Sequence, residues 1–124
     1  MKRSNTSGQW GERVAARYLR RHFYRILNTN FRSRFGEIDI IAETWKYLVF
    51  VEVKTRKNDE FASAADFVTH AKQQRLISTA QLYLSQQPTT KQPRFDVIEI
   101  YAPEGTQTKH PKVHHIQDAF QTDS

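Results

Sequence analysis

The stretch that decides the fold runs from Gly36 to Lys54 and reads GEIDIIAETWKYLVFVEVK. It contains two largely apolar runs, residues 37–42 and 47–54, separated by a short polar turn. Their alternation predicts two strands of an antiparallel hairpin, because successive side chains of a strand point to opposite faces. The second run begins apolar on both faces, which is typical of a central strand in a sheet.

Two acidic residues and a lysine are predicted to gather on this hairpin. The turn is expected at Trp45 and Lys46. Such a turn places Asp39 of the first strand opposite Glu52 of the second, with their Cβ atoms about 5 Å apart. Lys54 shares a face with Glu52 because the two residues are two apart on one strand.

The chemistry of this trio points to a metal site. Two close carboxylates on a largely apolar face repel each other and lose hydration, and a divalent cation relieves both penalties. Oxygen ligands without a nearby Cys or His favour Mg²⁺ or Mn²⁺, and Lys54 beside them suits phosphoryl chemistry. The alternative is structural: Glu52 and Lys54 form a solvated charge pair, and Asp39 begins a turn.

Further helices and strands are predicted on either side of the hairpin, within a single domain that spans residues 1–124. Helices are expected from Ser7 to about His22 and, capped by Thr69, to about Gln86, and further strands at about 24–30 and 94–101. Residues 1–6 are expected to be a mobile tail. Residues 104–124 are expected to be a loosely docked C-terminal segment, whose histidines, His110, His114 and His115, are solvated. This order predicts an α/β fold, with a mixed sheet flanked by helices.

Composition and charge narrow the class of protein. The absence of cysteine excludes disulfide scaffolds and thiolate chemistry, and no apolar run is long enough to span a membrane. We therefore expect a soluble, cytoplasmic protein. Residues 1–35 carry nine basic side chains against one acidic one, which favours a nucleic-acid partner over a merely solubilising surface. The residues predicted to contact nucleic acid are Arg13, Arg17, Arg20, Arg21, Arg32, Arg34 and Lys72.

Three residues on the predicted helices do not fit their local surroundings. Glu12 lies within the apolar arc of the first helix, so we expect it to point towards the carboxylate cluster; the alternative is a salt bridge to an arginine. Lys72 falls in the first turn of its helix, where a cation opposes the macrodipole, and is either a phosphate contact or a surface lysine. Gln73 falls in the apolar stripe, as a core amide or a site contact.

The sequence also resembles a known family. The segments that carry the resemblance are residues 8–12, 36–42, 49–56 and 94–97, together with Lys72, Arg75 and the stretch from His115 to Phe120. They resemble the YraN-type family of small bacterial proteins, which is similar to PD-(D/E)XK nucleases and, among them, to Holliday-junction resolvases. The resemblance implies a three-layer restriction-endonuclease-like fold, an active site at Asp39, Glu52 and Lys54, and a helix-borne acid at Glu12. Arg56 lies in a matching segment and is a secondary candidate. Ile38 stands where the superfamily motif has proline.

Together these features predict a Mg²⁺- or Mn²⁺-dependent DNA endonuclease, acting on structured or branched DNA. Asp39, Glu52 and Glu12 are the candidate metal ligands. A non-catalytic nucleic-acid-binding accessory protein of recombination or repair and a structural, ribosome-associated protein are the alternatives. A homodimer stays open beside a monomer.

Overall fold

The computed structural model describes residues 6–57 and 68–122 of the 124. The expected mobile tail lies outside this range except for Thr6, which begins the first helix one residue before the predicted start. The elements, in chain order, are α1 (Thr6–Arg21), β1 (Arg25–Ser33), β2 (Gly36–Glu43), β3 (Tyr47–Arg56), α3 (His70–Gln86), β4 (Gln92–Tyr101), η1 (Gly105–Gln107) and β5 (Lys112–Phe120).

The five strands form one mixed sheet in the order β1-β2-β3-β4-β5, in which β3 and β4 run parallel and all other neighbours antiparallel. The predicted hairpin is confirmed. Ile40 pairs with Val51, and Glu43 pairs with Leu48. This is the register expected from a turn at Trp45 and Lys46. β3 is the third of the five strands and has a neighbour on each side, so it is the central strand.

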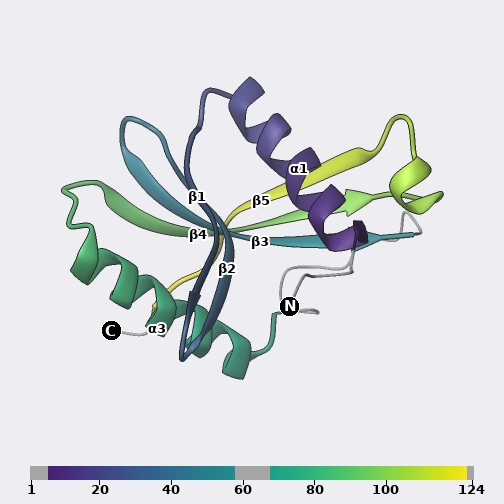
Figure 1. Ribbon diagram of the computed structural model, residues 1–124. Helices are drawn as coiled ribbons and strands as arrows, with labels where there is room; N and C mark the ends of the chain where they lie inside the picture. Colours follow the sequence, from purple (N-terminus) through teal and green to yellow (C-terminus); the bar gives the residue numbers. More distant parts are fainter. Residues whose placement is uncertain (1–5, 58–67, 123–124) are drawn as a thin grey trace.

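Two helices cover opposite faces of the sheet (Figure 1). On one face, Val14, Ala15 and Leu19 of α1 pack on apolar side chains of β2, β3 and β4. On the other face, α3 packs with its buried stripe, which includes Leu76 and Tyr83. The predicted three-layer α/β fold is therefore confirmed and is consistent with a restriction-endonuclease-like fold. Among the residues that the structure describes, no helix is long and apolar enough to cross a membrane.

The C-terminal region differs from the expectation. Residues Lys112–Phe120 form β5, an edge strand paired with β4, rather than a loosely docked segment. The strand was not predicted because its apolar residues do not alternate regularly; a register shift in the pairing near Asp96 displaces them. His115 is consequently buried, with a side chain only 5% exposed, so the expectation of a solvated tail is wrong for this residue.

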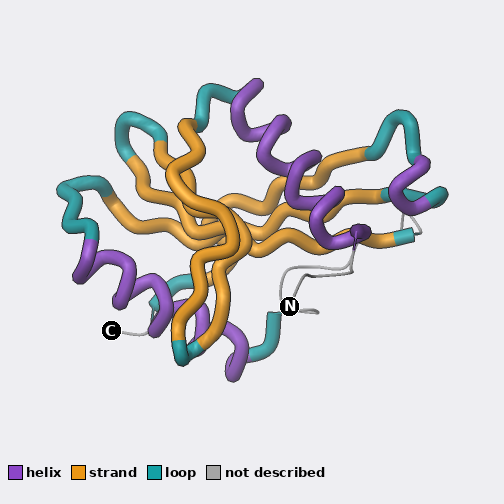
Figure 2. Tube along the Cα trace, in the orientation of Figure 1, coloured by secondary structure: helices purple, strands orange, loops and turns teal. Residues whose placement is uncertain are grey.

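The sheet divides at the predicted site. The pairing of β2 with β3 ends at Ile40 and Val51, although β2 continues to Gly36 beside β1, and β3 continues to Arg56 beside β4. Figure 2 shows the β1–β2 hairpin turning away from β3 at this point. The tip of that hairpin packs on α3, where Ser33 Oγ lies 3.1 Å from Thr79 Oγ1. We call this division of the sheet, with Asp39 and Glu52 as its first residues, the fork.

Candidate active site

Glu52 is the most buried acid of the fork and is held by two lysines. Its Oε2 lies 2.6 Å from Lys72 Nζ and 3.4 Å from Lys54 Nζ. Lys54 comes from the same strand, two residues further on, whereas Lys72 reaches across from the first turn of α3. This ion pair explains a cation at a helix N-terminus, where the macrodipole disfavours it.

Asp39 lies on the other arm of the fork. Its Oδ2 accepts a hydrogen bond of 2.8 Å from the backbone N–H of Val53, just beyond the last pair of the β2–β3 ladder. Burial and the neighbouring charge of Glu52 raise the pKa of Asp39 to about 7, against the lowering effect of the Val53 N–H. The structure thus brings Asp39 and Glu52 into electrostatic contact, and within the described residues no salt bridge joins Asp39 to a lysine or arginine.

The two lysines respond to this environment in opposite directions. Burial, together with the hydrogen bond and the charge of Lys72, lowers the pKa of Lys54, although Glu52 opposes the shift. Burial also acts to lower the pKa of Lys72, but the hydrogen bond and the charge of Glu52 outweigh it and raise the value. Lys72 is therefore the firm ion-pair partner of Glu52, and Lys54 gives up its proton more readily.

Glu12 reaches towards the fork from α1. Its Oε1 accepts a hydrogen bond of 2.9 Å from Asn30 Nδ2, and its charge contributes to the raised pKa of Asp39. No ion pair joins Glu12 to an arginine in the part of the chain that the structure describes. Glu12 therefore belongs to the surroundings of the site.

Asn30 was not predicted to lie at the site. Its neighbours Thr29 and Phe31 pair with Ile40 and Ile38, so Asn30 stands opposite Asp39. Its φ of 55° is in the left-handed region, which asparagine adopts more easily than other non-glycine residues. The available signal was an asparagine inside a predicted strand, where this residue is depleted.

The donor groups of the fork fit a divalent cation. Among the described residues, no three acidic or histidine side chains come close enough to enclose a metal by themselves. Mg²⁺, however, commonly takes one or two carboxylates and keeps several waters. Asp39 and Glu52 supply two such carboxylates, and a bound cation would offset the burial and the charge of Glu52 that raise the pKa of Asp39.

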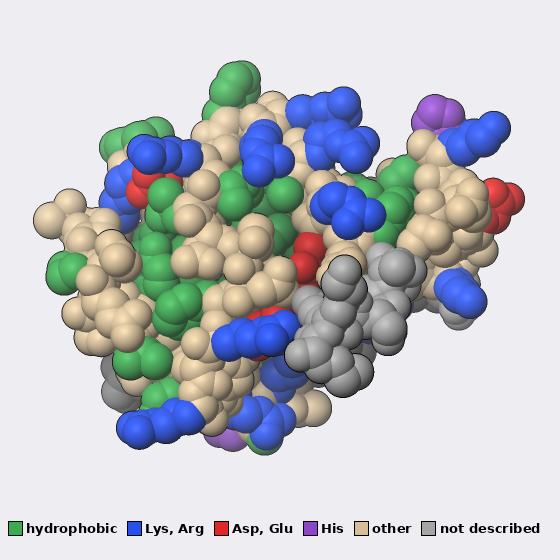
Figure 3. Space-filling model, in the orientation of Figure 1, with side chains coloured by type: hydrophobic (Ala, Val, Ile, Leu, Met, Phe, Trp, Pro, Cys, Tyr) green, Lys and Arg blue, Asp and Glu red, His purple; other side chains and the backbone are tan. Residues whose placement is uncertain are grey.

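The basic side chains of residues 1–35, which we expected to form one patch, are divided into two groups. The α1 group is exposed and consists of Arg13, Arg17, Arg20 and Arg21; Figure 3 shows basic side chains gathered over this helix. Arg32 and Arg34 lie instead at the tip of the β1–β2 hairpin, next to α3, and Arg32 is 3.8 Å from Glu37. A single patch over residues 1–35 is therefore wrong, because the hairpin carries its arginines to the other helix.

The two secondary candidates, Gln73 and Arg56, contact residues outside the fork. Gln73 donates a hydrogen bond of 3.0 Å to the carbonyl oxygen of Val68, which supports its interpretation as a satisfied amide. Arg56 lies 3.8 Å from the fully buried Glu99 of β4.

A second polar cluster lies between β4, β5 and α1. Asp96 accepts two hydrogen bonds from Arg94, at 2.9 and 2.7 Å, and its Oδ2 lies 2.7 Å from Nε2 of His115. The Nδ1 of His115 is 3.2 Å from the hydroxyl of Tyr18, and Arg94 also donates to the hydroxyl of Tyr24. We call this set the Asp96 network.

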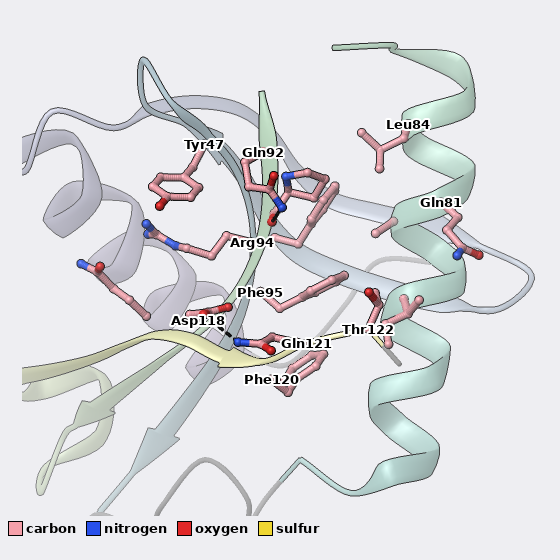
Figure 4. Close-up of a pocket in the computed structure, with 15 residues that line it drawn as sticks. Tyr47, Gln81, Leu84, Gln92, Arg94, Phe95, Asp118, Phe120, Gln121 and Thr122 are labelled. Atoms are coloured by element: carbon pink, nitrogen blue, oxygen red, sulfur yellow. Dashed lines mark hydrogen bonds between the residues drawn. The ribbon is translucent and has the colours of Figure 1, made fainter. Parts of the chain in front are cut away.

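A cavity of about 700 Å³ opens on the α3 face of the sheet, between α3, β4 and the end of β5 (Figure 4). Phe95 and Phe120 form part of its apolar wall, and Arg94 reaches its edge. None of Asp39, Glu52 and Lys54 lines this cavity. The candidate site is thus the fork itself, and not the larger hollow.

Comparisons with known proteins agree with the resemblance seen in the sequence. The model of the uncharacterised protein family UPF0102 matches residues 11–100. A UPF0102 protein of Vibrio parahaemolyticus is 52% identical over 96 residues, which cover 76% of this chain and 79% of the relative. A UPF0102 protein of Caldanaerobacter subterraneus is 43% identical over 123 residues, covering 97% of this chain and 100% of the relative. The expected YraN-type relationship is confirmed, and the chain belongs to the UPF0102 family.

Proposed function

We propose that this protein is a metal-dependent nuclease that hydrolyses phosphodiester bonds of DNA. The observation that carries the proposal is the fork, where Asp39 and Glu52 meet beside Lys54 at the point where two strands separate. Separation of the strands frees this edge of the sheet for a substrate. A sheet that stayed paired here would fill the same space with backbone.

Asp39 and Glu52 would hold Mg²⁺ or Mn²⁺. When bound, the ion supplies positive charge that stabilises a phosphate and the groups entering and leaving it. Glu12, held by Asn30, would act from further out, by binding ordered water or adjusting the charge of the site. Lys72 shares Glu52 with Lys54 and would fix the orientation of that carboxylate.

Lys54 has the chemistry of a group that acts on the attacking water or on the phosphate. Its pKa is lowered by burial and by Lys72, so it exchanges a proton more easily than an exposed lysine. A lysine in this state can orient a water molecule or offset the charge that develops on the phosphate. Removing its amino group should therefore affect turnover far more than binding.

The arginines of α1 would supply affinity for the DNA backbone. Their side chains are exposed on the helix that also carries Glu12. Contacts of arginine with phosphate give affinity without reading sequence, and they weaken as salt rises. A preference for branched or structured DNA is the finer part of the proposal and follows from the resemblance to junction resolvases.

A non-catalytic DNA-binding protein is the second candidate, and one observation favours it. Glu52 is already neutralised by two lysines, with Lys72 Nζ at only 2.6 Å. A carboxylate in such an ion pair needs no metal ion. In this case the fork would be a structural charge cluster, and the arginines would account for the whole activity.

A cleavage assay separates the two candidates. Linear duplex, single-stranded and four-way branched DNA are incubated with the protein in Mg²⁺ or Mn²⁺, beside Asp39→Ala, Lys54→Ala and the exposed-lysine control Lys112→Ala. Under the proposal, Asp39→Ala and Lys54→Ala lose at least about 100-fold in rate, while Lys112→Ala cleaves normally. Binding by Lys54→Ala stays within a few-fold of the original.

The triple variant Arg13→Ala, Arg17→Ala, Arg20→Ala tests the binding surface in the same assay. It should bind more weakly and with a flatter salt dependence, since each lost phosphate contact removes roughly 0.9 from the log–log slope on duplex DNA. If no DNA form is cut with either metal, and Lys54→Ala behaves like Lys112→Ala, the nuclease is rejected in favour of the binding protein.

A further inference from the structure

Two large aromatic side chains are exposed at the end of the sheet opposite the fork. Phe23 is 91% exposed and Trp45 is 87% exposed. Phe23 lies in the connection from α1 to β1, and Trp45 in the β2–β3 turn. Arg25 of β1 pairs with Glu43 of β2, so each aromatic residue stands two positions beyond the same cross-strand pair. The two side chains therefore leave the sheet at the same end.

The backbone at Phe23 is unusual for so bulky a residue. Helix α1 ends in a left-handed turn: Tyr24 N–H donates to Leu19 O at 2.9 Å, and Phe23 N–H donates to Arg20 O at 3.1 Å. Phe23 has a φ of 69°, where glycine is the usual residue. A phenylalanine is strained here, and its exposed ring gains no burial in return. Folding of the helix end therefore does not account for this side chain.

The charge around the two rings is positive. Arg20 and Arg21 end α1 next to Phe23, and Lys46 adjoins Trp45; all three are exposed. The acid of this end, Glu43, is neutralised by two cations, with Lys91 Nζ at 3.0 Å and Arg25 at 3.6 Å. Exposed aromatic faces beside cations suit a ligand that combines flat rings with phosphates.

We propose that Phe23 and Trp45 form a stacking surface for unpaired bases of a single-stranded nucleic acid. The proposal rests on the proposed function in one respect: the same DNA would continue along α1 to the fork. Arg21 lies nine positions after Glu12, which corresponds to about 14 Å along the helix axis. That distance corresponds to about four base pairs at 3.4 Å each. A substrate with unpaired bases a few positions from the cleaved bond would contact both ends of the helix.

Fluorescence of Trp45 tests the surface without any cleavage. In a Trp10→Phe background, Trp45 is the remaining tryptophan of the chain. This protein is titrated, without metal, with a single-stranded oligothymidylate, an abasic strand of equal length and a blunt duplex. The thymidylate should quench the fluorescence, whereas the abasic strand, which offers only sugar and phosphate, should leave it nearly unchanged.

Affinities of variants give the second readout. Trp45→Ala and Phe23→Ala should each weaken single-strand binding by about 5- to 100-fold and change duplex binding less than about twofold. Phe35→Ala is the control, because Phe35 lies in the β1–β2 turn, at the other end of the strands from Phe23 and Trp45. It should leave the ratio of single-strand to duplex affinity unchanged. Phe23→Gly should weaken single-strand binding while raising Tm by about 2–5 °C, because glycine relieves the left-handed strain.

Three results would overturn the proposal: equal quenching by the abasic strand, equal loss of duplex and single-strand binding, or a sedimentation experiment in which Trp45→Ala converts a dimer to a monomer. The last result would make this surface a contact between two copies of the chain. Failure of the nuclease would appear separately, as absent cleavage by a protein whose Trp45 still responds to single strands.

Discussion

Two aspartates inside this fold have opposite electrostatic surroundings. Asp39 at the fork receives one backbone hydrogen bond from Val53, and burial with the charge of Glu52 raises its pKa to about 7. Asp96 is only 1% exposed, yet its pKa is lowered, because the hydrogen bonds from His115 and Arg94 outweigh the effect of burial. The difference lies in the partners and not in the degree of burial.

This contrast separates a structural acid from one available to a ligand. Asp96 accepts from a bidentate guanidinium, an imidazole and the backbone N–H of Asp118 at 3.0 Å, so its charge is fully compensated. Asp39 has neighbouring carboxylates instead, and a bound cation would offset the cost of ionising it beside them. A folded protein gains nothing from the second arrangement unless something binds there.

Asp96→Asn should have the largest effect on stability. The change leaves Arg94 buried without its carboxylate, and breaking one side of a buried ion pair typically costs about 3–5 kcal/mol. The matched variant Asp39→Asn removes a charge that burial and Glu52 disfavour, so its free energy of unfolding at pH 8 should equal or exceed that of the original. Urea unfolding of both variants measures this. A larger loss for Asp39→Asn would reverse the comparison.

The pH dependence should differ in sign between the two acids. The pKa of Asp39 is raised from 3.8 to about 7, so the folded state binds more protons between these values, and stability falls as pH rises from 4 to 8. The pKa of Asp96 is lowered, so its contribution is present above pH 3.8 and lost as pH falls further.

Thermal unfolding from pH 3 to 8 without metal checks both signs. Asp39→Asn should remove about 1–3 kcal/mol of the decline between pH 4 and 8. Asp96→Asn should instead reduce the loss of stability that occurs below about pH 3.8. Added Mg²⁺ should stabilise the original protein at pH 8 and leave Asp39→Asn unaffected. If the stability of Asp39→Asn changed with pH as that of the original protein does, the Asp39 carboxylate would not be the group that causes the decline.

The sequence could predict that Asp39 stands opposite Glu52, but neither the separation of the strands there nor the Asp96 network, for a physical reason. The hairpin from Gly36 to Lys54 is local, and its turn length determines which residues face each other, so the register followed from the sequence. The Asp96 network joins α1, β4 and β5, and its contacts depend on a fifth strand with an irregular apolar pattern. Hydrogen bonds between segments nearly 100 residues apart, such as the one between Tyr18 and His115, cannot be predicted from the spacing of residues along the chain.

The same limit applies to the basic residues and to Glu12. Net charge along the first 35 residues cannot show that Arg32 and Arg34 turn away with a hairpin that packs on α3. The position of Glu12 in an apolar arc could be read, because helical periodicity is local. Its partner, Asn30, could not, because the contact joins α1 to an irregular, left-handed position of β1 that no periodic pattern predicts.

Lys72→Met should have a moderate effect on the free energy of unfolding. It removes one of the two cations that compensate Glu52, so the acids of the fork become less compensated than Asp96. One third of the Lys72 side chain is exposed, so water screens its ion pair with Glu52, and the loss should be about 1 kcal/mol without metal. The stabilisation by Mg²⁺ should then increase, because the ammonium group no longer competes for Glu52. Titration of Tm with Mg²⁺ measures this, and a smaller metal response would mean that Lys72 assists the metal rather than competing with it.

The smallest effect is expected at Asn30, where two substitutions separate strain from hydrogen bonding. Asn30→Gly loses the bond to Glu12, worth about 1 kcal/mol, but relieves the φ of 55°, so its stability should stay within about 0.5 kcal/mol of the original. Asn30→Ala loses the bond and keeps the strain, so it should be less stable than Asn30→Gly by about 1 kcal/mol. Inside an ordinary strand the order would be reversed, because glycine weakens strands. Urea unfolding of the two variants measures this difference. If Asn30→Ala were more stable than Asn30→Gly, the left-handed backbone opposite Asp39 would relax once Asn30 is replaced. Asn30 would then determine the backbone conformation at the fork.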